Sequence, residues 1–175
     1  MNAPRILIAG IGNIFLGDDA FGVEVAMRLS RREMPEGVRV VDFGIRGFDL
    51  AYALMEDYHT AILVDAMPRG EAPGTVYTLE IENDAAEAAP GRPVEIDPHG
   101  MNPMRVLEMV KSLGGRPGRV LVVGCEPHSL GDQEEGTLGL SAPVEAAVEV
   151  AIDVLHHLVG KIGSEYRASV PAAAV

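Results

Sequence analysis

The sequence contains one cysteine and no tryptophan among its 175 residues. A single cysteine, Cys125, cannot form an internal disulfide, and this usage is typical of a reducing compartment, so we expect a cytoplasmic protein. The chain also lacks any apolar run close to the roughly 20 residues that a membrane-spanning helix needs. Its N-terminus lacks the charged segment and long apolar stretch of a signal peptide, so we expect no secretory leader.

Basic residues are scarce: 14 lysines and arginines stand against 26 aspartates and glutamates, which gives a formal net charge of −12. A nucleic acid or an anionic membrane needs a basic protein surface, so neither is an expected partner. Apolar residues make up 47% of the chain, which is enough for the core of one globular domain. We place that domain at residues 1–163 and expect residues 164–175 to be a flexible tail.

The chain opens with a strand, a glycine-rich loop and a helix. The apolar run at 6–9 predicts a buried strand, and the apolar spacing along 21–29 predicts a helix. The loop begins like the dinucleotide fingerprint G-x-G-x-x-G, but its third glycine position holds Phe15. The loop also carries Asp18 and Asp19, whose charge is stabilised at a helix N-terminus but would repel a pyrophosphate. The sequence therefore predicts no nucleotide cofactor and favours a cation or a proton-transfer role.

Strand-like and helix-like segments alternate along the rest of the sequence. This alternation predicts an α/β fold with a mostly parallel sheet that helices cover on both faces. The segment 74–81 follows Pro73 and alternates only partly, so we expect an edge or antiparallel strand there. Asn102 before Pro103 marks the start of a helix. The other segments are strands at about 38–41, 60–64 and 119–123 and helices at about 48–57, 104–113 and 143–159.

Several reactive side chains follow the carboxyl ends of predicted strands, where open parallel sheets bind ligands. They are Asp18, Asp19, Asp42, Asp65 and Cys125. Asp19 and Asp65, together with His99 in a turn-like segment, offer two carboxylates and an imidazole. Such a set suits a divalent first-row metal and leaves coordination positions open. The residues alone also allow another interpretation, in which Asp19 caps a helix, Asp65 ends a strand and His99 packs.

A thiol enzyme is a further alternative, with His99 or His128 as the base for Cys125. However, a lone cysteine after a buried strand is usually an inert small hydrophobic residue. The sequence also lacks the H-E-x-x-H helix of common zinc proteases and the G-x-S-x-G elbow of serine hydrolases. We therefore expect no catalytic role for Cys125.

Four segments, taken together, resemble those of one family, the maturation endopeptidases of nickel–iron hydrogenases. The likeness covers about residues 5–160 and implies a three-layer fold, with a twisted, mostly parallel sheet of about five strands flanked by helices. It also implies an activity, the removal of a short C-terminal extension from a hydrogenase large-subunit precursor after nickel insertion. The four segments are Gly10 to Asp19 with Gly22, Asp42 to Gly47, Leu63 to Ala66, and Pro98-His99, and Gly139 to Val144 matches as well.

The resemblance also assigns site residues. An acidic residue of the first loop, an aspartate after the third strand and a histidine bind metal in this family. They correspond to Asp19, Asp65 and His99, which the resemblance makes the metal ligands and the catalytic set. The nickel is expected to come from the precursor, which is the expected partner, and not to belong to the enzyme.

The mechanism stays open among three possibilities. In the first, Asp19, Asp65 and His99 bind the precursor's nickel and so orient the peptide bond. In the second, a bound metal polarises the carbonyl or activates water. In the third, a carboxylate such as Asp42 or Asp18 acts as a general base. The alternative function is a non-catalytic, nickel-dependent docking or chaperone module for the precursor.

Overall fold

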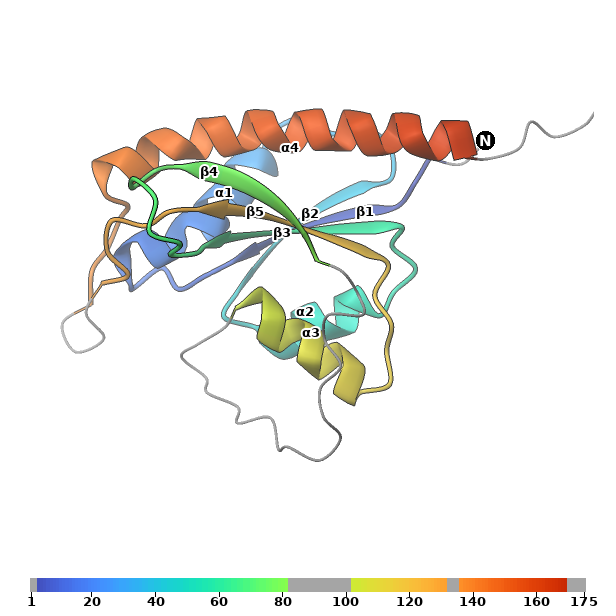
Figure 1. Cartoon of the computed structure of the whole chain (residues 1–175), viewed down its shortest axis with the longest axis horizontal. Helices are drawn as coiled ribbons and strands as arrows, with labels where there is room; N and C mark the ends of the chain where they lie inside the picture. The colour runs from blue at the N-terminus through green and yellow to red at the C-terminus, as the bar shows by residue number, and fades with distance from the viewer. Residues whose placement is uncertain (1–2, 82–101, 132–135, 170–175) are drawn as a thin grey trace, which may run out of the picture.

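The computed structural model describes residues 3–81, 102–131 and 136–169. These ranges form a sheet between two layers of helices, which confirms the predicted three-layer α/β fold (Figure 1). The strands are β1 (Ile6–Ile11), β2 (Val38–Gly44), β3 (Thr60–Ala66), β4 (Val76–Ile81) and β5 (Arg119–Cys125). The helices are the 3-10 turn η1 (Gly17–Ala20), α1 (Phe21–Leu29), α2 (Gly47–Leu54), α3 (Pro103–Ser112) and α4 (Ala142–Ser169).

The strand order in the sheet is β2-β1-β3-β5-β4. The strands β2, β1, β3 and β5 are parallel, whereas β4 pairs with β5 in the antiparallel direction at the edge. The expectation of an edge or antiparallel strand within 74–81 is therefore confirmed. Because the four parallel strands end on the same side, the residues at their carboxyl ends meet along one rim of the sheet.

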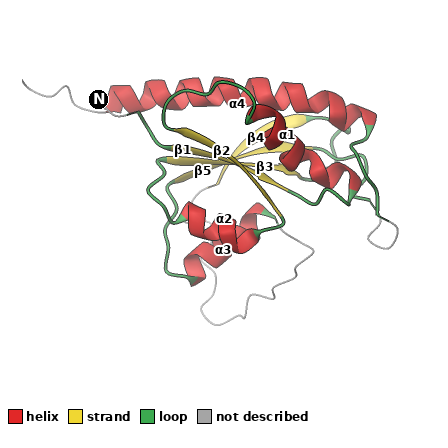
Figure 2. Cartoon of the chain, turned by 180° about the vertical axis from the view of Figure 1, so that it is seen from behind, coloured by secondary structure: helices red, strands yellow, loops and turns green. Residues whose placement is uncertain are grey.

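Each face of the sheet has its own hydrophobic layer. Side chains alternate between the two faces along a strand, so Ile6 and Ile8 pack with α1 and α4, while Leu7 and Ala9 pack with α2 and α3. Figure 2 shows the same division, with α4 and α1 on one side of the sheet and α2 and α3 on the other. Burial on both faces explains why these strands read as continuous apolar runs.

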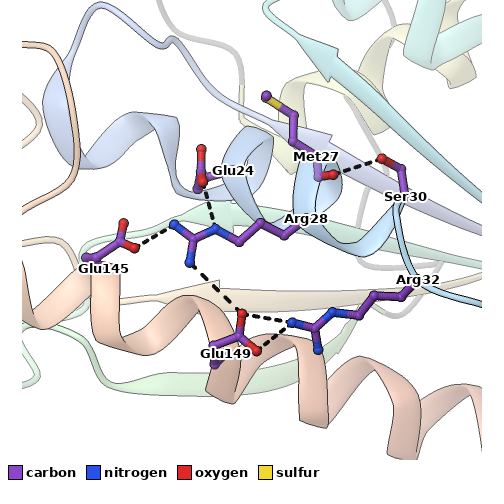
Figure 3. A network of polar contacts seen from close by, with 7 residues as sticks. All are labelled: Glu24, Met27, Arg28, Ser30, Arg32, Glu145 and Glu149. Carbon is purple, nitrogen blue, oxygen red and sulfur yellow. Dashed lines mark hydrogen bonds and ion pairs between the residues drawn. The ribbon is translucent and has the colours of Figure 1, made fainter.

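A group of charged side chains joins α1 to α4 on the outside of the molecule (Figure 3). The guanidinium of Arg28 lies 2.7 Å from a carboxylate oxygen of Glu24 and 2.5 Å from one of Glu145. Arg32 contacts Glu149 at 2.6 Å. These pairs join α1 and the residues just after it to the N-terminal part of α4.

Several elements extend beyond their predicted ends. β2 and β3 continue past residues 41 and 64, so Asp42 and Asp65 are strand residues and do not lie in loops. α4 runs to Ser169 and takes in the first residues of the expected tail. Its apolar spacing continues through Val159 and Ile162, which are buried in the core, and this burial explains the extra length. In the ranges that the structure describes, no helix has the length and apolar character needed to cross a membrane.

Candidate functional site

A pocket of about 410 Å³ opens at the carboxyl rim of the sheet. Asp19 from η1 and Asp65 from β3 both line it. Much of the remaining described lining is apolar and includes Ile45, Met104 and Leu130. The structure thus brings two of the three predicted site residues to one apolar-walled pocket.

Close packing of α1 against the sheet brings Asp19 to Asp65. β1 and β3 are neighbours, and Gly10 pairs with Val64. At Gly22, an added Cβ would lie 2.0 Å from the carbonyl oxygen of Val64, so any larger residue would collide with the backbone of β3. Gly22 follows Asp19 by three residues and Val64 directly precedes Asp65, so this contact places both aspartates at the same pocket.

The glycine-rich loop wraps around Asp19. Gly12 has a φ of +139°, and a Cβ there would lie 1.8 Å from the carbonyl oxygen of Asp19, so the loop requires glycine for sterics and not for a phosphate. The Oδ2 atom of Asp19 accepts a hydrogen bond from the N–H of Asn13 at 2.8 Å. Burial raises the pKa of Asp19, and the Asn13 hydrogen bond opposes this rise.

Asp65 is the most strongly perturbed carboxyl of the site. It is only 3% exposed. Burial raises its pKa well above the usual value, the negative charge of Asp19 raises it further, and the hydrogen bond from the N–H of Ala66 opposes the rise. Because ionising both aspartates is unfavourable, protonation of Asp65 or binding of a cation would stabilise the pair.

The donor set of the pocket fits a divalent cation in part. Carboxylate oxygens are suitable ligands, and a cation would offset the repulsion between Asp19 and Asp65. The third predicted ligand, His99, lies outside the described residues. Among the residues that the structure does describe, no group of three or more His, Cys, Asp or Glu side chains is arranged to hold a metal ion.

Asp18 has a different role from its neighbour. Asp18 is 1% exposed. Its carboxylate accepts hydrogen bonds from the N–H groups of His128 at 2.8 Å, Ser129 at 3.1 Å and Ser141 at 2.6 Å, and from the Ser141 hydroxyl at 2.9 Å. Burial alone raises the pKa of Asp18, but these hydrogen bonds outweigh it, so the pKa is lowered. A carboxylate so fully bonded is a poor general base, which argues against one of the bases left open by the sequence.

Ser141 links Asp18 to the last helix. It directly precedes α4, and its carbonyl accepts the N–H of Glu145 at 2.8 Å. Its hydroxyl, however, donates to Asp18. Sequence reasoning missed this long-range bond because nothing local to either residue pairs them.

Asp42 and Cys125 do not line the described part of the pocket. Oδ1 of Asp42 is buried without a hydrogen-bond partner among the described residues, and its carbonyl accepts from Arg46. Cys125 is fully buried. Burial, followed by the charges of Asp18 and Glu126, raises the pKa of its thiol to about 12. A thiol in this state is unsuited to nucleophilic attack.

Comparison with known proteins points to one family. The family model described as hydrogenase maturation protease matches residues 23–157. A putative hydrogenase maturation protease of Methanocaldococcus jannaschii is 32% identical over 159 residues, which cover 89% of this chain and 96% of that protein. The hydrogenase 2 maturation protease of Escherichia coli is 33% identical over 150 residues, which cover 85% and 87%. The solved structure of the E. coli hydrogenase maturating endopeptidase HybD superposes with a TM-score of 0.70 at 30% identity, covering 91% of this chain and 94% of that one.

Proposed function

Since the chain belongs to the hydrogenase maturation protease family, we propose that it removes the C-terminal extension of a nickel–iron hydrogenase large-subunit precursor after nickel insertion. Membership of the family makes the chain a protease. The C-terminal cleavage site and the dependence on nickel are the proposed part. The observation that carries the proposal is the pair of Asp19 and Asp65 on one apolar-walled pocket.

The walls of the pocket suit a polypeptide substrate. Ile45 is 56% exposed, and Met104 and Leu130 are each 40% exposed. Exposed apolar side chains beside a pocket mark a surface that binds another molecule. An extended segment of the precursor would cover these side chains while its scissile bond lies beside the two aspartates.

The nickel ion is part of the substrate in this proposal. The carboxylates of Asp19 and Asp65, together with the imidazole of His99, would hold it. Asp65 is buried beside another carboxylate, so the two negative charges repel each other. The nickel ion of a bound precursor would offset this repulsion. Because the carboxylate oxygens would hold the ion at a fixed position, the precursor would present its peptide bond in one orientation. When bound, the ion also supplies positive charge that polarises a carbonyl or a water molecule.

The composition of the pocket supports hydrolysis by water. Among its described lining residues there is no serine, threonine or cysteine. The chain's single cysteine is buried away from that lining. The proposal therefore includes no covalent acyl-enzyme, and in it a carboxylate of the Asp19–Asp65 pair would accept a proton from water.

Incubation with a nickel-loaded precursor tests the proposal. We expect a shortened large subunit from the wild type and none from the Asp19→Ala, Asp65→Ala or His99→Ala variants, with unchanged circular dichroism spectra. Asp153→Ala is the matched control, because Asp153 is exposed on α4. Binding without cleavage by the wild type would instead support the docking or chaperone function. Near-normal cleavage by any two of the three site variants would contradict the assigned residues.

A further inference from the structure

The segment that leaves β5 touches both the turn that carries Asp19 and the loop that follows Asp65. It comprises residues 126–129, directly after the last residue of β5. At its first residue it contacts the loop that follows β3 and Asp65. At its last two residues it contacts the turn that carries Asp19.

Glu126 forms the first contact. Glu126 is buried, with 5% of the residue exposed. Oε2 accepts the N–H of Arg69 at 2.7 Å, and Oε1 accepts the N–H of Gly70 at 3.2 Å. The loop that it holds begins with Met67 and Pro68, which line the pocket directly after Asp65 and Ala66. A buried carboxylate is tolerated only where hydrogen bonds replace water, so these bonds fix the position of the loop.

Further contacts hold the same loop against β5. The N–H of Met67 donates to the carbonyl of Cys125 at 2.9 Å. The hydroxyl of Tyr77 donates to the carbonyl of Met67 at 2.7 Å. At Gly124, a Cβ would lie 2.4 Å from the ring of Tyr77, so glycine there admits the ring. The loop after Asp65 is therefore held by hydrogen bonds at Met67, Arg69 and Gly70.

Asp18 forms the second contact, through its hydrogen bonds from the N–H groups of His128 and Ser129. The residue after Asp18 is Asp19, and the residue after Ser129 is Leu130, and both line the pocket. Neither Asp18 nor Glu126 is among the described lining residues. Their effect on a bound substrate must therefore pass through the backbone that they hold.

We propose that residues 126–129 are a brace between the turn that carries Asp19 and the loop that follows Asp65, and that Asp18 and Glu126 are positioning residues that fix Asp19 relative to Asp65. The catalytic consequence of this brace rests on the proposed function. Each carboxylate uses both of its oxygens to accept backbone N–H groups. An isosteric amide would turn an NH₂ group toward one of those donors and lose that bond, so Asn and Gln test the brace without changing side-chain size.

The first test is a double-variant cycle on cleavage of the nickel-loaded precursor. Asp18→Asn and Glu126→Gln should each lower kcat by about 10- to 100-fold, with a smaller change in KM, because misplacement of orienting groups impairs chemistry more than docking. The double variant should be about as impaired as the worse single variant, since one lost anchor already frees the brace. Glu80→Gln is the control, because Glu80 is exposed on β4 and paired with Arg119.

The second test is amide hydrogen exchange in the same full-length variants, which needs no substrate. Glu126→Gln should speed exchange at Arg69 and Gly70 and also at the far end of the brace, at His128 and Ser129. Asp18→Asn should speed exchange at His128 and Ser129 and also at Arg69 and Gly70. Exchange changes confined to the mutated end, or kcat losses that multiply in the double variant, would overturn the brace. A wild type that cleaves no precursor would overturn the proposed function, and the exchange data would still decide the brace.

Discussion

Gly22 of α1 lies so close to Val64 of β3 that a Cβ on the glycine would be 2.0 Å from the valine carbonyl oxygen and 2.3 Å from that of Ile11. Both obstacles are backbone atoms of central strands, which cannot move away as a flexible side chain would. The approach of α1 to the sheet, and with it the place of Asp19 beside Asp65, therefore depends on the absence of a side chain at one position.

Gly22→Ala is expected to destabilise the protein by about 3 kcal/mol, because the added methyl forces α1 off the sheet. Urea unfolding measures the loss. Gly160→Ala is the matched control: Gly160 is also helical, but nothing lies within 4 Å of a Cβ there, so alanine should stabilise α4 by about 0.5–1 kcal/mol. Equal stability of Gly22→Ala and the wild type would contradict the packing argument.

The sequence was sufficient to predict the architecture, but it did not reveal that Asp18 and Asp19 have different roles. Apolar runs and helix signals report local structure, so the strands, the N-cap at Asn102 and the antiparallel edge were predictable and are confirmed. The role of Asp18 depends on residues more than 100 positions away, including Ser141. Long-range hydrogen bonds of this kind leave no periodic pattern in the sequence. The same reason hid the role of Glu126.

Asp65→Asn should make the metal-free protein more stable at neutral pH. Burial and the Asp19 charge raise the pKa of Asp65 in the folded state, so the folded state binds its proton more tightly than the unfolded state does. That stabilisation is fully present below the unfolded value of 3.8 and is lost as the pH rises through the folded pKa. Because asparagine cannot ionise, the Asp65→Asn variant does not lose this stability as the pH rises.

Urea unfolding in a chelator, at several values from about pH 4 to pH 8, measures this difference. The gain of Asp65→Asn over the wild type should grow with pH, whereas Asp153→Asn, at an exposed position, should show no such trend. A difference that stays constant, or that shrinks as the pH rises, would mean that Asp65 ionises freely in the folded protein.

Cys125→Ala should retain full precursor cleavage and lose about 1 kcal/mol of stability, because it removes one packed sulfur atom from the core. The wild-type thiol, fully buried and with its pKa raised to about 12, should react with iodoacetamide only slowly in the folded protein and quickly in urea. Mass spectrometry of the alkylated protein measures both rates. A folded Cys125→Ala variant without activity would restore the thiol mechanism.

Arg28→Met should lower the free energy of unfolding by about 1 kcal/mol and more at low salt, because Arg28 joins Glu24 to Glu145 across the two helices. Combined with Glu145→Gln, it should give a coupling energy of about 0.5 kcal/mol. Arg5→Met is the control, since Arg5 forms an exposed pair with Glu56 at 3.3 Å, and it should cost less than about 0.5 kcal/mol. Equal effects at the two arginines would argue against the network.

Cleavage should depend on the state of the precursor and not on the sequence of its extension alone. Asp19 and Asp65 form an acidic pair that a cation would stabilise, and the described pocket lining has no serine, threonine or cysteine. If the precursor brings that cation, only the loaded form completes the site, so the extension stays in place until insertion is finished.

The measurement compares three substrates at equal enzyme concentration: the nickel-loaded precursor, the metal-free precursor and the bare C-terminal peptide. We expect cleavage of the first to be at least about 100-fold faster than that of the others, as orientation effects of this kind commonly are. Adding nickel salt to the enzyme and the bare peptide is the control, because free metal without the folded precursor should not restore cleavage. Equal rates for loaded and metal-free precursor, or efficient cutting of the peptide, would instead identify a protease that reads linear sequence.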